Sequence, residues 1–148
     1  MLKITRKFDY AMLLLTELGL RPRDPASARS IAERHRLSQS LAANVLKGLQ
    51  RNSLVRSLRG AHGGYLLARS PDRISLNSIM TAIDGNRSMA KCARSGRKKG
   101  GCPARETCPS RGYMALLEGR IRSVFEESTL ADVISHVARR KPSVGDGP

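Results

Sequence analysis

The sequence has few acidic and few aromatic residues, and both features limit the kinds of partner that the protein can bind. Asp and Glu number 12 against 27 Lys and Arg in a chain of 148 residues, so the formal net charge is +15. A surplus this large favours an anionic partner, most commonly nucleic acid. Aromatic residues make up only 3% of the chain, and no basic amphipathic helix carries aromatic anchors. We therefore expect binding to nucleic acid and not to a membrane.

The sequence also lacks long apolar runs and the common catalytic motifs. Residues 11–20 are apolar, but Glu17 interrupts them, no small-residue cleavage site follows, and the run is too short to span a bilayer. No phosphate-binding loop, nucleophile elbow or pair of metal-binding histidines is present. These absences predict a cytoplasmic protein that is not an enzyme. The length of 148 residues predicts one domain with an appended arm.

Residues 38–51 have the pattern of a recognition helix. Ser38 can cap its start, and Leu41, Val45 and Leu49 recur at every fourth position to form an apolar stripe. The other face carries small, amide and cationic side chains, namely Gln39, Ser40, Ala43, Asn44, Lys47 and Arg51. Such a face suits the floor of the DNA major groove, where amides can pair with adenine. On this helix alone, an ordinary solvated face is equally consistent.

The residues that follow predict a β-hairpin. Two short apolar runs, residues 54–58 and 65–67, flank a linker, residues 59–64, with glycines where positive φ is needed. A basic hairpin directly after a capped helix is typical of a winged helix-turn-helix, whose wing lies beside the DNA backbone or the minor groove. The residues predicted to contact DNA are Ser38, Gln39, Ser40, Asn44, Lys47, Arg56, Arg59 and His62.

The surrounding segments complete the predicted fold. A short helix, residues 28–35, and the tight turn Arg36-Leu37 precede the recognition helix, which is the helix-turn-helix spacing. A first helix, residues 4–20, and a later one, residues 76–83, pack on this unit. The predicted fold is mostly α with a small β-hairpin: a winged helix-turn-helix domain, residues 1–85, followed by a long C-terminal dimerisation helix.

Residues 111–140 are predicted to contain this dimerisation helix and a final helix. The seam along the first of them consists of Met114, Leu117, Ile121 and Val124. The seam can pack on the chain's own core or on the same helix of a second chain. Twofold pairing is favoured because a dimer matches the symmetry of a palindromic DNA site. Residues 141–148 are predicted to be a flexible tail.

Between these parts, residues 86–110 contain all three cysteines and too few apolar residues for a core. An odd number of cysteines within 17 residues argues against a disulfide framework and for metal or redox chemistry. Thiolates can hold an iron–sulfur cluster or zinc, and such bonds would order the loop. The closely paired cysteines common in zinc sites are missing, and basic neighbours favour thiol oxidation. From spacing alone, a cluster, zinc and a metal-free thiol switch all stay open.

Two motifs and the order of the elements resemble the IscR/NsrR family of bacterial winged-helix regulators. The more specific motif is RGxxGGYxLAR, residues 59–69, and the other is ISLNSIMTAIDG, residues 74–85. The resemblance covers residues 1–137. It implies a homodimer that binds palindromic promoter sites and holds an iron–sulfur cluster, 4Fe–4S or 2Fe–2S, whose state sets DNA affinity. By position, the implied cluster ligands are Cys92, Cys102 and Cys108.

The chain departs from the family pattern at several positions. Nine residues separate Cys92 from Cys102, more than in relatives, and Arg111 stands where IscR-type members have a histidine. Ala43 stands where many relatives have a glutamate, so the operator preference does not carry over. Asp9 either offsets nearby cations at a helix start or, as the resemblance implies, ligates the cluster of the other subunit.

The sequence thus predicts a DNA-binding transcriptional regulator, expected to be a repressor, whose cluster senses nitric oxide, oxidant or iron–sulfur status. The alternative is a metal-independent or zinc-containing DNA-binding or structural protein, whose cysteines are incidental or act as a thiol switch. Visible cluster absorbance of anaerobically purified protein would separate the two.

Overall fold

The computed structural model describes residues 4–85, 102–104 and 106–139. The predicted ligand Cys92, most of the predicted cluster loop and the predicted tail lie outside these residues. The elements, in chain order, are α1 (Arg6–Leu20), α2 (Ala28–Arg34), α3 (Gln39–Arg51), β1 (Val55–Leu58), β2 (Gly64–Leu67), the 3-10 turn η1 (Pro71–Arg73), α4 (Leu76–Asp84), α5 (Arg111–Glu127) and α6 (Leu130–Arg139). This order confirms the predicted fold class.

Serine caps set the starts of three helices. The hydroxyls of Ser27, Ser38 and Ser75 accept hydrogen bonds from the amides of Ser30, Leu41 and Ser78, at 3.0, 3.2 and 3.2 Å. Each cap satisfies an amide that has no partner inside its helix, which contributes about 1 kcal/mol. The caps explain why α2, α3 and α4 begin where they do.

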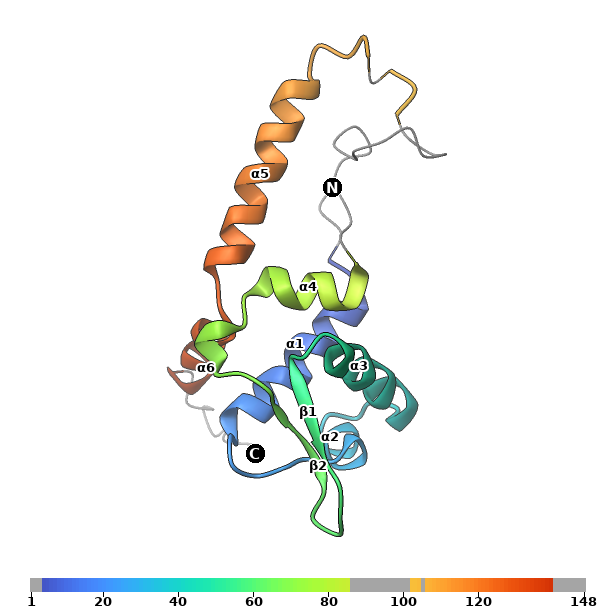
Figure 1. The fold of residues 1–148 in the computed structure, drawn as a ribbon, viewed down its shortest axis with the longest axis vertical. Coiled ribbons are helices and arrows are strands. Elements are labelled where there is room, and N and C mark those ends of the chain that lie inside the picture. Colours follow the sequence, from blue (N-terminus) through green and yellow to red (C-terminus); the bar gives the residue numbers. More distant parts are fainter. Residues whose placement is uncertain (1–3, 86–101, 105, 140–148) are drawn as a thin grey trace, which may run out of the picture.

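The core is built around α1, which lies at the centre of the body (Figure 1). The body consists of α1 to α4, the hairpin, η1 and α6. Leu14 and Leu15 of α1 are fully buried, as are Leu46 and Leu49 of α3. Burial of one leucine side chain stabilises a fold by about 1.5–3 kcal/mol. Since α1 contacts α3, α4, α6 and β2, this helix holds the recognition helix and the hairpin on one core.

The hairpin is antiparallel, with Leu58 opposite Gly64. Gly60, in its turn, has a φ of 118°, which residues with a side chain rarely adopt. Tyr65 exchanges two backbone hydrogen bonds with Ala26, at 3.2 and 2.9 Å. A Cβ atom on Gly64 would lie 2.8 Å from the carbonyl oxygen of Ala26, so this close approach requires glycine. The hairpin is thereby docked beside the start of α2.

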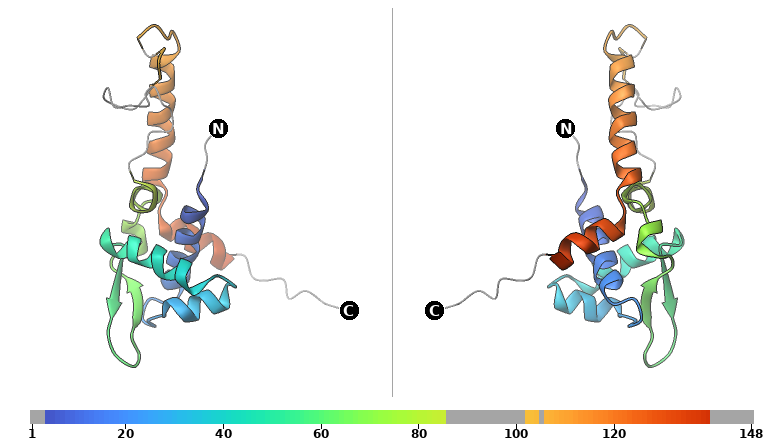
Figure 2. Two further views of the ribbon diagram at one scale, coloured as in Figure 1. Left: turned by 90° about the vertical axis from the view of Figure 1, so that its right-hand side faces the viewer. Right: turned by 90° about the vertical axis from the view of Figure 1, so that its left-hand side faces the viewer.

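α5 extends away from the body, and the hairpin projects at the opposite end of the molecule (Figure 2). Helix α5 contacts α4, and α6 returns to pack on α1. Backbone hydrogen bonds from Leu76 to Ser128 (2.9 Å) and from Leu130 to Ile74 (2.8 Å) hold the base of α5 against the body. Among the described residues, no helix is both long and apolar enough to cross a membrane.

Candidate nucleic-acid interface and thiol site

α3 has one buried and one exposed face. The buried residues are Ala42, Val45, Leu46 and Leu49. The predicted contact residues Gln39, Ser40, Asn44 and Lys47 are all exposed, as is Ser38, which caps the helix. Their amide, hydroxyl and ammonium groups can bond to base edges and phosphates. The structure therefore brings the predicted groove residues together on one accessible surface.

One acidic side chain of α1 fixes α2 to the body. The Glu17 side chain is 11% exposed, and its carboxylate pairs with the Arg34 guanidinium and, at 3.3 Å, with His35 Nε2. Arg21 Nε lies 3.8 Å from the same carboxylate. Glu17 therefore pairs with one basic side chain just after α1, Arg21, and with two at the end of α2, Arg34 and His35. This pairing orients α2 and, through the turn that follows, the start of α3.

The predicted wing residues Arg56, Arg59 and His62 are all exposed. A hydrogen bond from Gln50 Nε2 to Ser57 Oγ (3.1 Å) joins the end of α3 to β1. It links the recognition helix to the wing, and sequence reasoning missed it. A glutamine and a serine on successive elements carry no pairing signal in the sequence, because many side chains can make such a bond.

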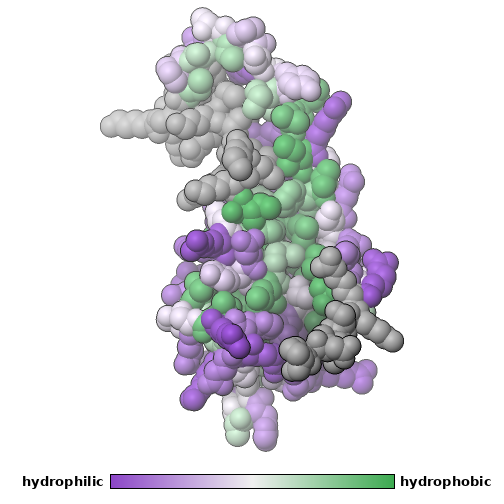
Figure 3. Space-filling model, turned by 180° about the vertical axis from the view of Figure 1, so that it is seen from behind, coloured by the Kyte–Doolittle hydropathy of each residue, from purple (hydrophilic) through white to green (hydrophobic). Residues whose placement is uncertain are grey.

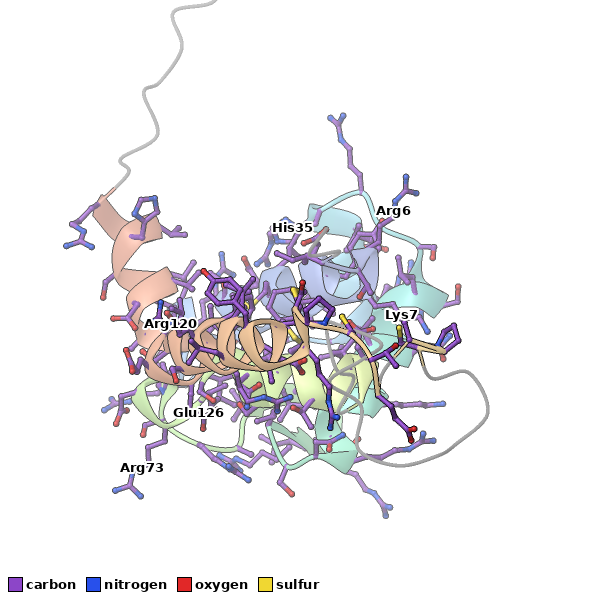
Figure 4. The ribbon with its side chains drawn as sticks, turned by 90° about the horizontal axis from the view of Figure 1, so that it is seen from above. Arg6, Lys7, His35, Arg73, Arg120 and Glu126 are labelled. Atoms are coloured by element: carbon purple, nitrogen blue, oxygen red, sulfur yellow. The ribbon has the colours of Figure 1, made fainter. Side chains whose placement is uncertain are left out.

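Most basic residues of the body are exposed, including Arg23, Arg29, Arg36, Lys47, Arg51, Arg56, Arg59, Arg69 and Arg73. Viewed from above, charged side chains project around the outline of the body, with Arg73 among them (Figure 4). When such cations bind phosphates, the counterions condensed on DNA are released, so this surface favours binding to DNA of any sequence.

The last turn of α4 contacts both α1 and α3. Thr5 Oγ1, at the start of α1, donates a hydrogen bond to Asp84 Oδ2 at 2.7 Å. Asn52 Nδ2, at the end of α3, donates to the carbonyl oxygen of Ala82 at 3.4 Å. The chain continues from α4 into the cysteine-bearing residues. Helix α4, which directly precedes the cysteine-bearing residues in the sequence, is therefore hydrogen-bonded to the end of the recognition helix.

Of the predicted cluster ligands, the structure describes Cys102, Cys108 and Asp9. Both thiols are free and half-buried, in the turns that precede α5. Asp9 is exposed in the first turn of α1, within the body, whereas these turns lie at the far end of α5 (Figure 1). Among the described residues, no group of three His, Cys, Asp or Glu side chains could hold a metal ion. A single chain does not bring these three candidates together.

Known proteins resemble this chain over nearly its whole length. The family model Rrf2, described as iron-dependent transcriptional regulator, matches residues 4–136. The HTH-type transcriptional regulator IscR of Erwinia tasmaniensis is 30% identical over 136 residues, which are 91% of this chain and 80% of that protein. Among solved structures, CymR (YrzC), the global cysteine regulator of B. subtilis, has a TM-score of 0.73 and 29% identity, over 92% of this chain and 98% of that one. T. potens IscR has a TM-score of 0.72 and 27% identity, over 97% and 94%.

An exposed polar recognition helix, a tight helix-turn-helix and a basic hairpin define a DNA-binding transcriptional regulator of the winged-helix class. The chain belongs to the Rrf2 family of transcriptional regulators, which are not enzymes. Membership of this family confirms the resemblance that the RGxxGGYxLAR motif indicated, since relatives named IscR are among the matches.

Proposed function

We propose that this protein is a homodimeric transcriptional repressor whose iron–sulfur cluster changes its DNA affinity in response to nitric oxide, oxidant or iron–sulfur status. The observation that carries the proposal is the pair of free, half-buried thiols of Cys102 and Cys108 before α5. They occur in a chain of a family described as iron-dependent. Thiolates are the protein ligands that iron–sulfur clusters most commonly use.

In this proposal α3 lies in the major groove of a palindromic promoter site. Asn44 supplies an amide for base edges, and its exposure near the middle of the polar face supports that role. Ser38, Gln39, Ser40 and Lys47 contact bases or phosphates around it. The wing residues Arg56, Arg59 and His62 place positive charge beside the backbone or the minor groove.

A second copy of the chain covers α5 in the proposed dimer. Four large apolar side chains of this helix are exposed: Tyr113 (65%), Leu116 (51%), Leu117 (38%) and Val124 (59%). Figure 3 shows hydrophobic surface running along α5. A contiguous apolar surface of this kind is typical of a protein interface, and a twofold axis would bring two such surfaces together. Of the four predicted seam residues, Leu117 and Val124 belong to this exposed surface, whereas Met114 and Ile121 are half-buried.

The proposed cluster ligands are Cys92, Cys102 and Cys108 of one chain and Asp9 of the partner subunit. This donor set fits a 4Fe–4S or 2Fe–2S cluster, because it combines soft thiolates with one weakly held oxygen ligand. Bound there, the cluster would supply an iron site that reacts with small oxidants or nitric oxide. The exposure of Asp9 on α1 supports access by a second chain. Its nearness to Thr5, which bonds to α4, offers a route from the ligand to the recognition helix.

Anaerobic purification tests the proposal. The parent protein is expected to absorb visible light and to contain iron and acid-labile sulfide. Cys102→Ser and Cys108→Ser should lose all three signals, whereas Thr107→Ala, in the same turn, should keep them. A parent protein that stays colourless and free of sulfide after anaerobic reconstitution would contradict the cluster.

A cluster-free thiol regulator is the second candidate. The likeness to CymR, which is described as a cysteine regulator, favours it, and so does the free state of Cys102 and Cys108. Here peroxide would oxidise a thiol to a sulfenic acid or a disulfide and so change DNA affinity. A colourless protein whose DNA affinity falls with peroxide and recovers with dithiothreitol would support this candidate over the first.

A further inference from the structure

The turn between α2 and α3 contains an arginine in an unfavourable backbone conformation. Helix α2 ends in paired hydrogen bonds, from the Leu37 amide to the Ala32 carbonyl (2.8 Å) and from the Arg36 amide to the Glu33 carbonyl (3.4 Å). This closing pattern requires a left-handed residue, and Arg36 supplies it with a φ of 54°. Glycine is the usual residue there, because a side chain in this conformation strains the backbone.

The end of α3 provides an internal comparison. Ser53 has the same φ of 54°, and the Leu54 amide bonds to the Leu49 carbonyl at 3.0 Å in the same pattern. Among the described residues, Arg36 and Ser53 are the non-glycine residues with positive φ. Serine is small and uncharged, whereas arginine carries a long cationic side chain. The two positions share one strain but differ in what their side chains can bind.

Among the described residues, none forms a hydrogen bond with the Arg36 side chain. Arg36 is exposed. Within the described part of the chain, no acidic side chain lies within ion-pair distance of its guanidinium, although its neighbours Arg34 and His35 both pair with Glu17. A residue that strains the backbone without stabilising a contact points to a role outside the folded chain.

The position of Arg36 suggests that role. It lies two residues before Ser38, the cap of α3, and three before Gln39, the first residue of the recognition helix. In a helix-turn-helix, the start of the recognition helix enters the major groove, which phosphates line on both sides. Arg36 lies in the turn that connects α2 to the start of α3. A guanidinium at this place can hold a phosphate with two hydrogen bonds.

We infer that Arg36 is a phosphate-binding residue that anchors the start of α3 on the DNA backbone, and that its strained turn is kept for this contact. The inference rests on the proposed placement of α3 in the major groove. A phosphate contact contributes to binding of any duplex, so the test does not require the natural operator.

The test compares Arg36→Gly, Arg36→Lys and Ser53→Gly with the parent protein. Binding to a short fluorescent duplex of mixed sequence is measured by anisotropy over a range of salt concentrations, and stability is measured by thermal unfolding. Arg36→Gly should melt at or above the parent temperature, yet bind DNA severalfold more weakly, with a salt slope smaller by about one. Arg36→Lys should keep most of the slope. Ser53→Gly should also melt at or above the parent temperature, with unchanged binding.

Three results would overturn the inference. Parent-like affinity and slope in Arg36→Gly would remove Arg36 from the interface, and a loss in Arg36→Lys as large as in Arg36→Gly would show that its charge does not act. A lower melting temperature in Arg36→Gly would show that the side chain serves the fold. Failure of the parent protein to bind any duplex would instead refute the proposed function, so the two failures are distinguishable.

Discussion

Helices α1 and α5, with 15 and 17 residues, bury their apolar side chains very differently. The buried residues of α1 are Phe8, Ala11, Leu14, Leu15 and Leu18. No residue of α5 is buried within the chain. The winged helix-turn-helix around α1 thus completes its core in one chain, whereas α5 leaves an apolar surface uncovered. From this difference we infer that a second chain covers α5 and so completes the cysteine-bearing arm, which consists of α5 and the turns before it.

The largest effect is expected from a charge on the exposed face of α5. Val124→Glu would place one carboxylate from each chain in the proposed interface, at a cost of about 3–5 kcal/mol of association free energy. Sedimentation should therefore show a monomer. Ala115→Glu is the matched control, because Ala115 is exposed nine residues away on the opposite face of the helix. If both variants were dimers, the interface would lie elsewhere. If the parent protein were a monomer, there would be no such interface.

A truncation in the core tests the same difference between α1 and α5. Leu15→Ala removes a fully buried side chain of α1 and should lower the free energy of unfolding by about 2–5 kcal/mol. Leu116→Ala in α5 should change it by less than about 0.5 kcal/mol in dilute, monomeric protein, because the side chain is already 51% exposed. Urea unfolding measures both values. Equal losses would show that α5 belongs to the core of the single chain.

Within the DNA-binding half, the recognition helix and the wing should contribute differently. Asn44→Ala should reduce discrimination between a duplex enriched by the parent protein from a random library and a mixed-sequence duplex, by about 1–3 kcal/mol. Arg59→Ala should weaken binding to both duplexes and flatten the salt dependence. Competition binding distinguishes the two patterns. If Asn44→Ala weakened both duplexes equally, Asn44 would not contact a base.

The smallest effect is expected at the start of α6, a helix that packs on α1 and η1. The Thr129 amide (2.7 Å) and hydroxyl (2.8 Å) both donate to Asp132 Oδ2. These bonds lower the pKa of the Asp132 carboxyl below its usual value of 3.8. Because the folded-state pKa is depressed, the stabilisation is present above pH 3.8 and is lost as the pH falls through the folded-state value.

Asp132→Ala should therefore melt slightly below the parent protein at neutral pH. The two melting temperatures should converge in acid, once the carboxyl is protonated in both the folded and the unfolded chain. A difference between the two proteins that does not change with pH would show that the loss reflects packing and not the charge of Asp132.

Local patterns predicted most of the fold. Serine caps and apolar periodicity located α2, α3 and α4, since a cap and a helical stripe depend on neighbours in the chain. The glycines of residues 59–64 predicted the hairpin for the same reason. Periodicity also predicted that α5 has an apolar face, but not which side the body would cover. Of the predicted seam residues, Leu117 and Val124 are exposed, whereas Met114 and Ile121 are half-buried.

Contacts between distant residues could not be predicted. The Thr5 to Asp84 hydrogen bond spans 79 positions and depends on how α1 and α4 pack. The left-handed backbone of Arg36 also went unrecognised, because arginine carries no signal for that conformation. The interface residues were chosen from the pattern and are exposed as expected, but their DNA contacts stay predictions. So does the full ligand set of the cluster.

The proposed control of DNA affinity passes from the cysteine-bearing turns before α5 to the winged helix-turn-helix. Its most direct test is the affinity of one anaerobic preparation for one enriched duplex, before and after removal of iron and sulfide. We predict a change of about 5-fold to 150-fold, the usual range of coupling between two sites. Cys108→Ser should show a single affinity, the same before and after the treatment. Equal affinities of the cluster-containing and cluster-free parent protein would contradict the claim.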